Sequence, residues 1–224
     1  CTAITFSGKD FYFGRNLDLE QTFGEETVIT PRNFPLPFRQ QPPITHHHAI
    51  IGIAHVANGY PLYYDAANEA GLCMAGLNFP GFARYLPIAE GKTNIASFEF
   101  IPWVLSQCGN MKEVRKLLPR LQLTDEAFSV QLPPSPLHWI IADQTECICI
   151  EPMADGIRIH NNPIGVLTNN PPFDDQLLQL CNFMHLSPHP PHNHFCSDVK
   201  LTPYSRGMGA MGLPGDLSSQ SRFV

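Results

Sequence analysis

The sequence is poor in charge and lacks any long apolar run. Charged side chains make up 15% of its 224 residues, and the net charge at pH 7 is -6. Such a chain has no basic field with which to hold a nucleic-acid backbone, so no nucleic-acid partner is expected. Its apolar stretches are also far shorter than the roughly 20 residues of a membrane-spanning helix, so no membrane partner is expected.

The sequence also lacks the cysteine pattern of a disulfide framework. Its seven cysteines are odd in number and scattered, which is typical of reduced thiols. The N-terminus does not show the charged and then apolar pattern of a secretory signal. These features together predict a cytoplasmic location.

What is present indicates one folded domain. Hydrophobic residues reach 43% of the chain, which is enough to bury a full core. The length suits a single large domain over residues 1–224, and no internal repeat is evident.

Alternation of apolar and polar residues predicts antiparallel strands along most of the chain. Residues 1–6 alternate, a turn follows at 7–10, and a returning strand at 11–16 completes a hairpin. A second hairpin is predicted over 49–64, where Asn58-Gly59 favours a tight turn. Further strands are predicted at 72–77, 137–142, 146–151, 156–160 and 164–168.

Helical periodicity is confined to a few segments. Apolar residues recur at helical spacing over 98–105 and 111–118, and Asn110 is placed to cap the second segment. A third helix is predicted over 174–185, and its inward side is formed by Leu177, Leu178, Cys181 and Met184. Antiparallel strands with helices grouped apart predict an α+β fold built in layers.

The first residue is a cysteine, which suggests a nucleophile. Cys1 combines a thiol with an α-amino group, whose reference pKa of about 7.7 to 8.0 lies near neutrality. One residue could therefore supply both the nucleophile and the base that accepts its proton. The alternative interpretation is that Cys1 simply became the first residue when an initiator methionine was removed.

Two charged residues on the returning strand strengthen the first interpretation. The predicted hairpin brings Arg15 and Asp18 close to Cys1. A guanidinium there would lower the pKa of the thiol, and a carboxylate would hold and orient the α-ammonium group. The alternative is a structural ion pair between Arg15 and Asp18.

Short blocks spread over the whole chain are similar to those of the choloylglycine hydrolase family, which contains bile salt hydrolases and penicillin V acylases. They occur in the order that the family has. The blocks are Cys1-Thr2, Phe13-Gly14-Arg15-Asn16-Leu17-Asp18, Asn68-Glu69-Ala70-Gly71-Leu72, Ala75-Gly76-Leu77-Asn78-Phe79-Pro80, Leu137-His138-Trp139, Val166-Leu167-Thr168-Asn169, Gly212-Leu213-Pro214-Gly215-Asp216 and Ser221-Arg222-Phe223.

The resemblance implies a fold and an assembly. It implies an N-terminal-nucleophile hydrolase with a four-layer αββα sandwich of antiparallel sheets. Because family members continue beyond the position of Val224, this chain is expected to lack the C-terminal part of the domain. The resemblance also implies a homo-oligomer, in the form of a tetramer.

The resemblance also implies a mechanism in which Cys1 is the nucleophile. Arg15 corresponds to a guanidinium beside its sulfur, and Asp18 corresponds to the carboxylate that holds the α-amino group. The thiolate attacks an amide carbonyl, the amine leaves as a thioester forms, and water hydrolyses the thioester. No metal or organic cofactor is implied.

Three further catalytic residues are implied by position. Asn78 and Asn169 correspond to donors for the oxyanion of the tetrahedral intermediate, through a backbone N–H and a side-chain amide respectively. Arg222 corresponds to the remaining active-site arginine. Without the resemblance, the two asparagines would be ordinary turn residues and Arg222 a solvated charge.

The implied substrate is a small amphipathic acyl amide. Penicillin V acylases commonly carry tyrosine where this chain has Asn78, which favours conjugated bile salts, with glycine or taurine as the released amine. Penicillin V and related acyl amides are the alternatives. The expected substrate-binding residues are Leu17, Phe23, Phe79, Phe82 and Leu137, and each of them could equally be a core residue.

Other interpretations are weaker. His189, His192, His194 and Cys196 include zinc-ligand types, but they lie in a Pro-rich stretch, and no metal site is predicted. No cysteine carries the local signature of a papain-like protease. A catalytically silent binding module with the same fold is the alternative from another class.

Overall fold

A computed structural model describes residues 1–187, 189, 192–201, 207–208 and 213–214. The chain divides into two compact units, Cys1–Phe173 and Asp174–Val224. Each unit is described by itself, and the assignment of residues 1–224 to one domain remains a prediction. No helix in the described part of the chain is long and apolar enough to cross a bilayer.

A seven-stranded sheet forms the centre of the first unit. Its strand order is β11-β10-β9-β6-β5-β4-β3, and all its neighbouring strands pair antiparallel. The strands are β3 (Glu26–Thr30), β4 (Ile50–Ala57), β5 (Tyr60–Asn68), β6 (Cys73–Asn78), β9 (Leu137–Ala142), β10 (Cys147–Met153) and β11 (Gly156–Asn161). The hairpin turn between β4 and β5 has the positive φ angles that Asn58-Gly59 predicts, 51° and 74°.

A three-stranded sheet of order β12-β1-β2 contains the N-terminus. Its strands are β1 (Thr2–Ser7), β2 (Phe11–Asn16) and β12 (Val166–Thr168). A short parallel pair, β7 (Thr93–Ala96) and β8 (Leu121–Thr124), lies outside both sheets. The predicted N-terminal hairpin is confirmed, whereas β3, β7 and β8 were not predicted, because a half-exposed edge strand and four-residue strands carry little periodicity.

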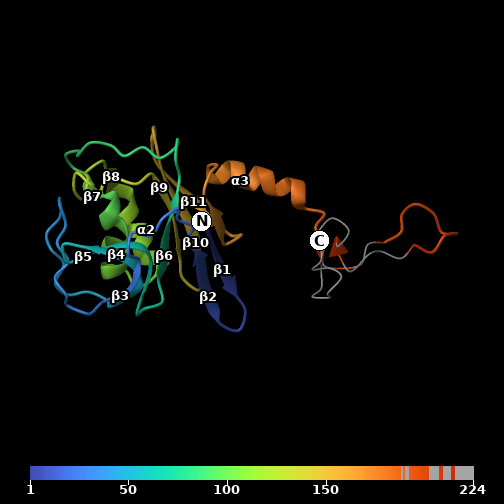
Figure 1. The fold of residues 1–224 in the computed structure, drawn as a ribbon, viewed down its shortest axis with the longest axis horizontal. Helices are drawn as coiled ribbons and strands as arrows, with labels where there is room; N and C mark the ends of the chain where they lie inside the picture. The colour runs from blue at the N-terminus through green and yellow to red at the C-terminus, as the bar shows by residue number, and fades with distance from the viewer. Residues whose placement is uncertain (188, 190–191, 202–206, 209–212, 215–224) are drawn as a thin grey trace. The chain divides into compact units, whose positions relative to one another are not determined.

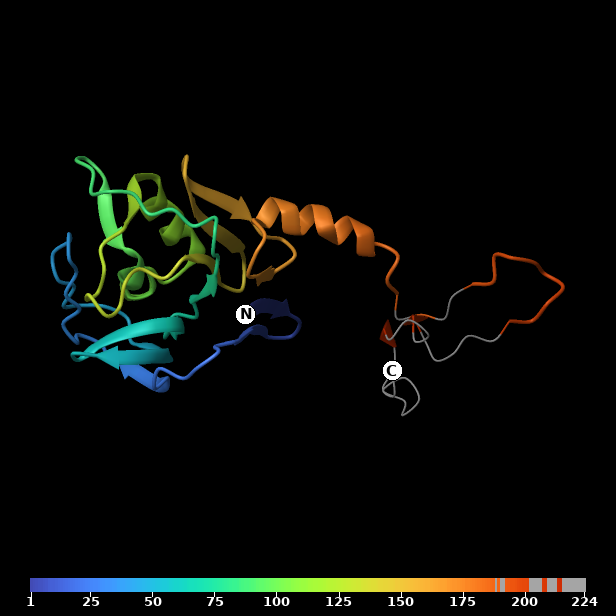
Figure 2. The same ribbon diagram turned by 45° about the horizontal axis from the view of Figure 1, so that its top comes forward.

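Helices pack on one face of the large sheet and the small sheet lies on the other (Figures 1 and 2). The helices are α1 (Phe100–Gln107) and α2 (Met111–Leu117), with short 3-10 turns η1 (Ser97–Glu99) and η2 (Leu118–Arg120). Side chains along β6 point alternately to the two faces of the large sheet. Met74 packs in the core beneath the helices, whereas Ala75 and Leu77 are buried on the opposite face. The α+β class with stacked antiparallel sheets is confirmed.

The described part of the second unit differs from prediction. The helix α3 (Phe173–Leu180) is followed by the turn η3 (Cys181–Phe183), and the two-residue strands β13 (Gly207–Met208) and β14 (Leu213–Pro214) pair with each other. The side chains of Leu178 and Met184 are 70% and 78% exposed, and Cys181 is exposed as well. The prediction that they face a core is therefore wrong, since periodicity identifies an apolar side of a helix but not what covers it.

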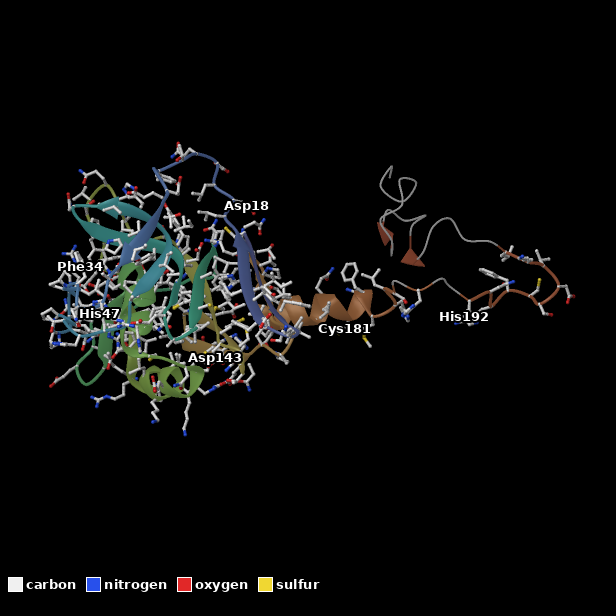
Figure 3. All side chains as sticks on the ribbon, turned by 90° about the horizontal axis from the view of Figure 1, so that it is seen from below. Asp18, Phe34, His47, Asp143, Cys181 and His192 are labelled. Atoms are coloured by element: carbon white, nitrogen blue, oxygen red, sulfur yellow. The ribbon has the colours of Figure 1, made fainter. Side chains whose placement is uncertain are left out.

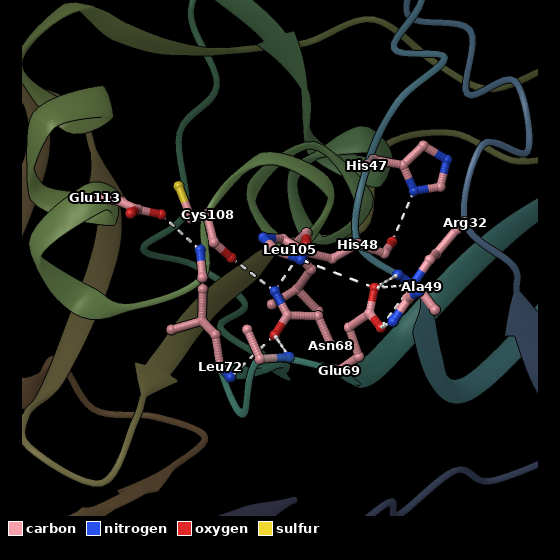
Figure 4. A network of polar contacts seen from close by, with 12 residues as sticks. Arg32, His47, His48, Ala49, Asn68, Glu69, Leu72, Leu105, Cys108 and Glu113 are labelled. Atoms are coloured by element: carbon pink, nitrogen blue, oxygen red, sulfur yellow. Dashed lines mark hydrogen bonds and ion pairs between the residues drawn. The ribbon is translucent and has the colours of Figure 1, made fainter.

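Asn68 ties the turn between β5 and β6 to the end of α1 (Figure 4). Its side-chain N–H groups donate to the carbonyls of Leu105 and Cys108 at 2.8 and 2.6 Å. Its carbonyl oxygen accepts from the N–H groups of Ala70 and Leu72, each at 3.1 Å. Since Asn68 is 5% exposed, no water can easily replace it, which gives this block of the sequence a structural role.

Asn68→Ala should lower the free energy of unfolding by about 3 kcal/mol or more, because four backbone groups lose their partner and three of these hydrogen bonds are buried. Asn110, whose side chain accepts the N–H of Glu113 and caps α2, is the matched control. Asn110→Ala should cost about 1 kcal/mol. Urea unfolding followed by tryptophan fluorescence measures both losses, and equal losses would contradict the role given to Asn68.

Candidate active site

Cys1 lies at the start of the middle strand of the small sheet. Thr2 pairs with Asn16 of β2 on one edge of β1 and with Thr168 of β12 on the other. The hydroxyl of Thr168 donates to the carbonyl of Cys1 at 3.0 Å, and the N–H of Thr2 donates to the side chain of Asn16 at 3.0 Å. The first residue is therefore held from both sides.

The α-ammonium group of Cys1 forms an ion pair with Asp18 at 2.9 Å. The side chain of Cys1 is 6% exposed, whereas that of Asp18 is 63% exposed and lies just beyond the end of β2 (Figure 3). The side-chain amide of Asn16 donates to both carboxylate oxygens of Asp18 at 3.3 Å. This arrangement fixes the amine beside the thiol of the same residue.

Arg15 shares a face of the small sheet with Cys1. It pairs with Ala3, and because side chains alternate along a strand, Arg15 lies diagonally across the ladder from Cys1. Its guanidinium, 5% exposed, forms an ion pair with Asp65 of β5 at 3.0 Å and donates to the carbonyl of Gly76 at 3.0 Å. Its ionic partner is thus not Asp18, which was the alternative drawn from the sequence.

Asp65 was missed by the sequence analysis. It lies 50 residues from Arg15 in the chain, next to the bulge where the register between β4 and β5 shifts at Ile53 and Ala54. No motif marks it, because the two strands meet only when the sheets stack. It anchors the guanidinium in the interior, where an unpaired charge would be costly.

Asn78 is the last residue of β6, the central strand of the seven-stranded sheet. In an antiparallel ladder, pairs that exchange hydrogen bonds alternate with pairs that do not. The N–H of Phe79 bonds to the carbonyl of Pro136 on the β9 side at 2.8 Å, so the N–H of Asn78 points away from β9. The carbonyl of Gly76, two residues earlier, points to the same side of β6, away from β9, and accepts a hydrogen bond from Arg15 there. The backbone N–H of Asn78 therefore points to the side of β6 on which the guanidinium of Arg15 lies.

Asn169 directly follows Thr168, the last residue of β12, and thus emerges beside Cys1. It is partly buried. The side chain of the next residue, Asn170, donates to the carbonyl of Pro80 at 2.9 Å. This bond ties the segment after Asn169 to the segment after Asn78. The sequence analysis missed Asn170 because its partner lies far away along the chain.

The predicted substrate-binding residues differ in their surroundings. Leu17 lines a cavity of about 310 Å³ together with Arg15 and Asp65. Phe82 and Phe23 are 37% and 47% exposed.

Two of these residues are packed in the interior. Phe79 is fully buried and stacks on His138 with a centroid distance of 4.2 Å, so in this structure it supports the site and offers no open surface. Leu137 is partly buried and packs against the core beneath the helices. The burial of both residues is compatible with the core-residue alternative, and their assignment to substrate binding stays a prediction.

Two larger cavities lie elsewhere in the first unit. Two cavities of about 510 and 490 Å³ share the lining residues Asp143, Gln144 and Thr145. Asp143 and Asp18 lie on well-separated sides of the first unit (Figure 3). Cavity size alone would therefore not have located the group around Cys1.

The structure does not bear on every expected site residue. Arg222 lies outside the described residues. Among those that are described, no group of three His, Cys, Asp or Glu side chains could hold a metal ion. The groups that the structure places around Cys1 are its own thiol and amine, the guanidinium of Arg15 and hydrogen-bond donors, and such groups suit acyl transfer.

Comparison with known proteins agrees with this chemistry. The family of linear amide C–N hydrolases called choloylglycine hydrolases matches residues 1–224. A bile salt hydrolase/transferase of Lactiplantibacillus plantarum is 54% identical over 224 residues, which cover 100% of this chain and 69% of that protein. A conjugated bile acid hydrolase of Lactobacillus gasseri is 41% identical over 229 residues, covering 100% of this chain and 72% of that protein.

Solved structures give the same picture. A variant of the conjugated bile acid hydrolase from Clostridium perfringens superposes with a TM-score of 0.86 at 35% identity, covering 100% of this chain and 70% of that one. Penicillin V acylase from Agrobacterium tumefaciens superposes with a TM-score of 0.70 at 18% identity, covering 88% of this chain and 62% of that one. The second likeness concerns the fold alone.

Cys1 should react with iodoacetamide at least about tenfold faster than Cys73 near pH 7.5, because only the thiolate is alkylated. Burial raises the pKa of Cys73 to about 11, and Cys73 is buried whereas Cys1 is partly exposed. Burial also raises the pKa values of Cys108 and Cys147 to about 12, so these thiols should react slowly too. Peptide mass spectrometry resolves each site, and equal rates for Cys1 and Cys73 would contradict the site.

Proposed function

Because this chain belongs to the choloylglycine hydrolase family, we propose that it hydrolyses the amide bond of conjugated bile salts and releases glycine or taurine. The observation that carries the proposal is the ion pair of 2.9 Å between Asp18 and the amine of the residue that bears the thiol. The relatives named as bile salt or conjugated bile acid hydrolases support the substrate class.

The proposed reaction proceeds through a thioester on Cys1. The α-amino group accepts the thiol proton, the sulfur attacks the amide carbonyl, and the C–N bond breaks as the amine takes up that proton. Water then attacks the thioester and gives its proton to Cys1, which leaves the free acid and the starting enzyme. Asp18 orients the amine throughout, and no cofactor is required.

Two donors are proposed for the oxyanion of the tetrahedral intermediates. They are the backbone N–H of Asn78, which points toward the edge where Arg15 lies, and the side-chain amide of Asn169. Arg15 is proposed to stabilise the thiolate, and Arg222 is proposed as a further active-site cation. Donors aimed at developing negative charge act strongly in a site with little water.

The proposed substrate is amphipathic. The cavity beside Leu17 is lined by apolar side chains such as Phe13 and Ile53, and by the charged pair Arg15 and Asp65. Phe23 and Phe82 offer exposed rings. Asn78 in place of tyrosine favours bile salts over penicillin V, which remains the second candidate substrate.

Location and assembly are proposed on weaker support. All seven cysteines are free in the structure, which supports a cytoplasmic protein. A homotetramer is proposed from the family resemblance. Apolar side chains such as Phe6 and Tyr12, 61% and 58% exposed on the small sheet, support burial in an assembly. Light scattering of the purified protein tests the stoichiometry.

Cys1→Ser should abolish release of taurine from taurocholate while leaving the fold intact, because an alcohol is far more weakly acidic than a thiol. Cys181→Ser, which changes an exposed thiol, is the matched control and should keep full activity. Taurocholate, glycocholate and penicillin V are assayed side by side. Release of phenoxyacetate alone would favour the penicillin acylase, and a wild-type protein inactive on every acyl amide would favour a binding module.

Asn169→Ala should lower kcat for taurocholate by about 10²- to 10³-fold with little change in KM, because the lost donor acts mainly in the transition state. Alkylation of Cys1 needs no oxyanion donor and should keep its rate. Asn161→Ala, an exposed change on β11, is the control. A KM effect without loss of kcat would assign Asn169 to substrate binding.

A further inference from the structure

A fully buried histidine–glutamate pair lies beneath the proposed active site, and the mechanism above does not use it. His138 of β9 and Glu151 of β10 are 0% and 1% exposed. Nδ1 of His138 lies 3.1 Å from a carboxylate oxygen of Glu151, which also accepts the N–H of Phe173 at 2.9 Å. The other carboxylate oxygen lies 3.2 Å from Nε2 of His160. Nε2 of His138 contacts the carbonyl of Thr168 at 2.8 Å.

The partners of His138 determine how its ring must bond. A backbone carbonyl can only accept, so Nε2 of His138 donates to Thr168. Nδ1 of His138 and the carboxyl group of Glu151 form a hydrogen bond through one proton, which either the ring or the carboxyl group carries. The ring is thus held at both nitrogens and cannot rotate without breaking a buried hydrogen bond.

The same ring touches both segments that carry the proposed oxyanion donors. One face stacks on Phe79, the residue after Asn78, with an angle of 6° between the rings and centroids 4.2 Å apart. Its Nε2 holds the carbonyl of Thr168, the residue before Asn169. The hydroxyl of Thr168 in turn donates to the carbonyl of Cys1 at 3.0 Å.

Stability alone does not account for this pair. Burying a carboxylate and an imidazole costs desolvation, and apolar side chains of similar volume generally fill such a space at least as well. A polar pair that fixes a geometry is the best-supported reason for retaining such groups. In this chain the geometry that it fixes is that of the two donor segments relative to each other.

We propose that His138, held by Glu151, is a positioning residue that sets the N–H of Asn78 and the amide of Asn169 at a common distance from the carbonyl attacked by Cys1. This inference deepens the proposed function and rests on it. His138 touches no substrate in this scheme and acts through Phe79 and Thr168. Displacing either donor by about 1 Å is enough to slow acyl transfer strongly.

The test compares His138→Gln, His138→Phe and the wild type. Glutamine removes the ring that stacks on Phe79 and the ring's bond to Thr168, whereas phenylalanine keeps a ring in the core and removes the hydrogen bonds to both Thr168 and Glu151. The control is Tyr63→Phe, which removes a buried hydrogen bond between β5 and Thr30 of β3. Hydrogen exchange is followed on peptides covering residues 76–82 and 165–171, together with kinetics on taurocholate.

His138→Gln should speed the exchange of backbone amide hydrogens by about tenfold or more in both peptides. It should lower kcat by about tenfold or more, while KM and the alkylation rate of Cys1 stay within about threefold. His138→Phe should loosen residues 165–171 but not 76–82, and it serves as the test if the glutamine variant does not fold. Tyr63→Phe should change neither peptide.

Several results would overturn the proposal. These are unchanged exchange in both peptides, alkylation of Cys1 that slows in parallel with kcat, or the same loss of kcat in Tyr63→Phe. Failure of the proposed function is a separate outcome, seen as a wild-type protein inactive on every acyl amide. The exchange measurement needs no substrate, so it decides in either case whether His138 couples the two segments.

Discussion

The pairing of β1 on both of its edges is the constraint on which the site depends. A first residue would ordinarily fray, but here β2 lies on one side and β12 on the other. Each neighbour brings chemistry to Cys1, since β2 leads to the carboxylate of Asp18 and β12 leads to Asn169. The position of the proposed nucleophile, Cys1, thus depends first on the backbone hydrogen bonds of β1 to its two neighbours.

Two buried polar groups join the small sheet to the large one. Arg15 reaches across to Asp65 and to the carbonyl of Gly76, and His138 reaches across to Thr168. Both contacts connect residues that border the site rather than residues at the far ends of the strands. Since stacked sheets otherwise meet through apolar side chains that can slide, these directional contacts determine how the two sheets are aligned at the site.

The opposite side of the large sheet has a different role. There the helices bury a continuous apolar core, and Asn68 closes the turn between β5 and β6 against the end of α1. This layer contributes no group to the site. It makes the large sheet rigid, so that β6 presents Asn78 and β9 presents His138 in a defined register.

The sequence by itself determined much of the fold and pointed to Cys1 as the candidate nucleophile. Alternation of apolar and polar residues reveals which side of a strand is apolar, so the hairpin of β1 and β2 and the strands β9 and β10 could be predicted. Cys1 could be singled out because it is the first residue of the sequence. Only the tertiary structure decided that Asp65 holds Arg15, that Phe79 is buried, and that His138 links two distant segments. These facts follow from the stacking of two sheets, which joins residues far apart in the chain and leaves no periodic signal in the sequence.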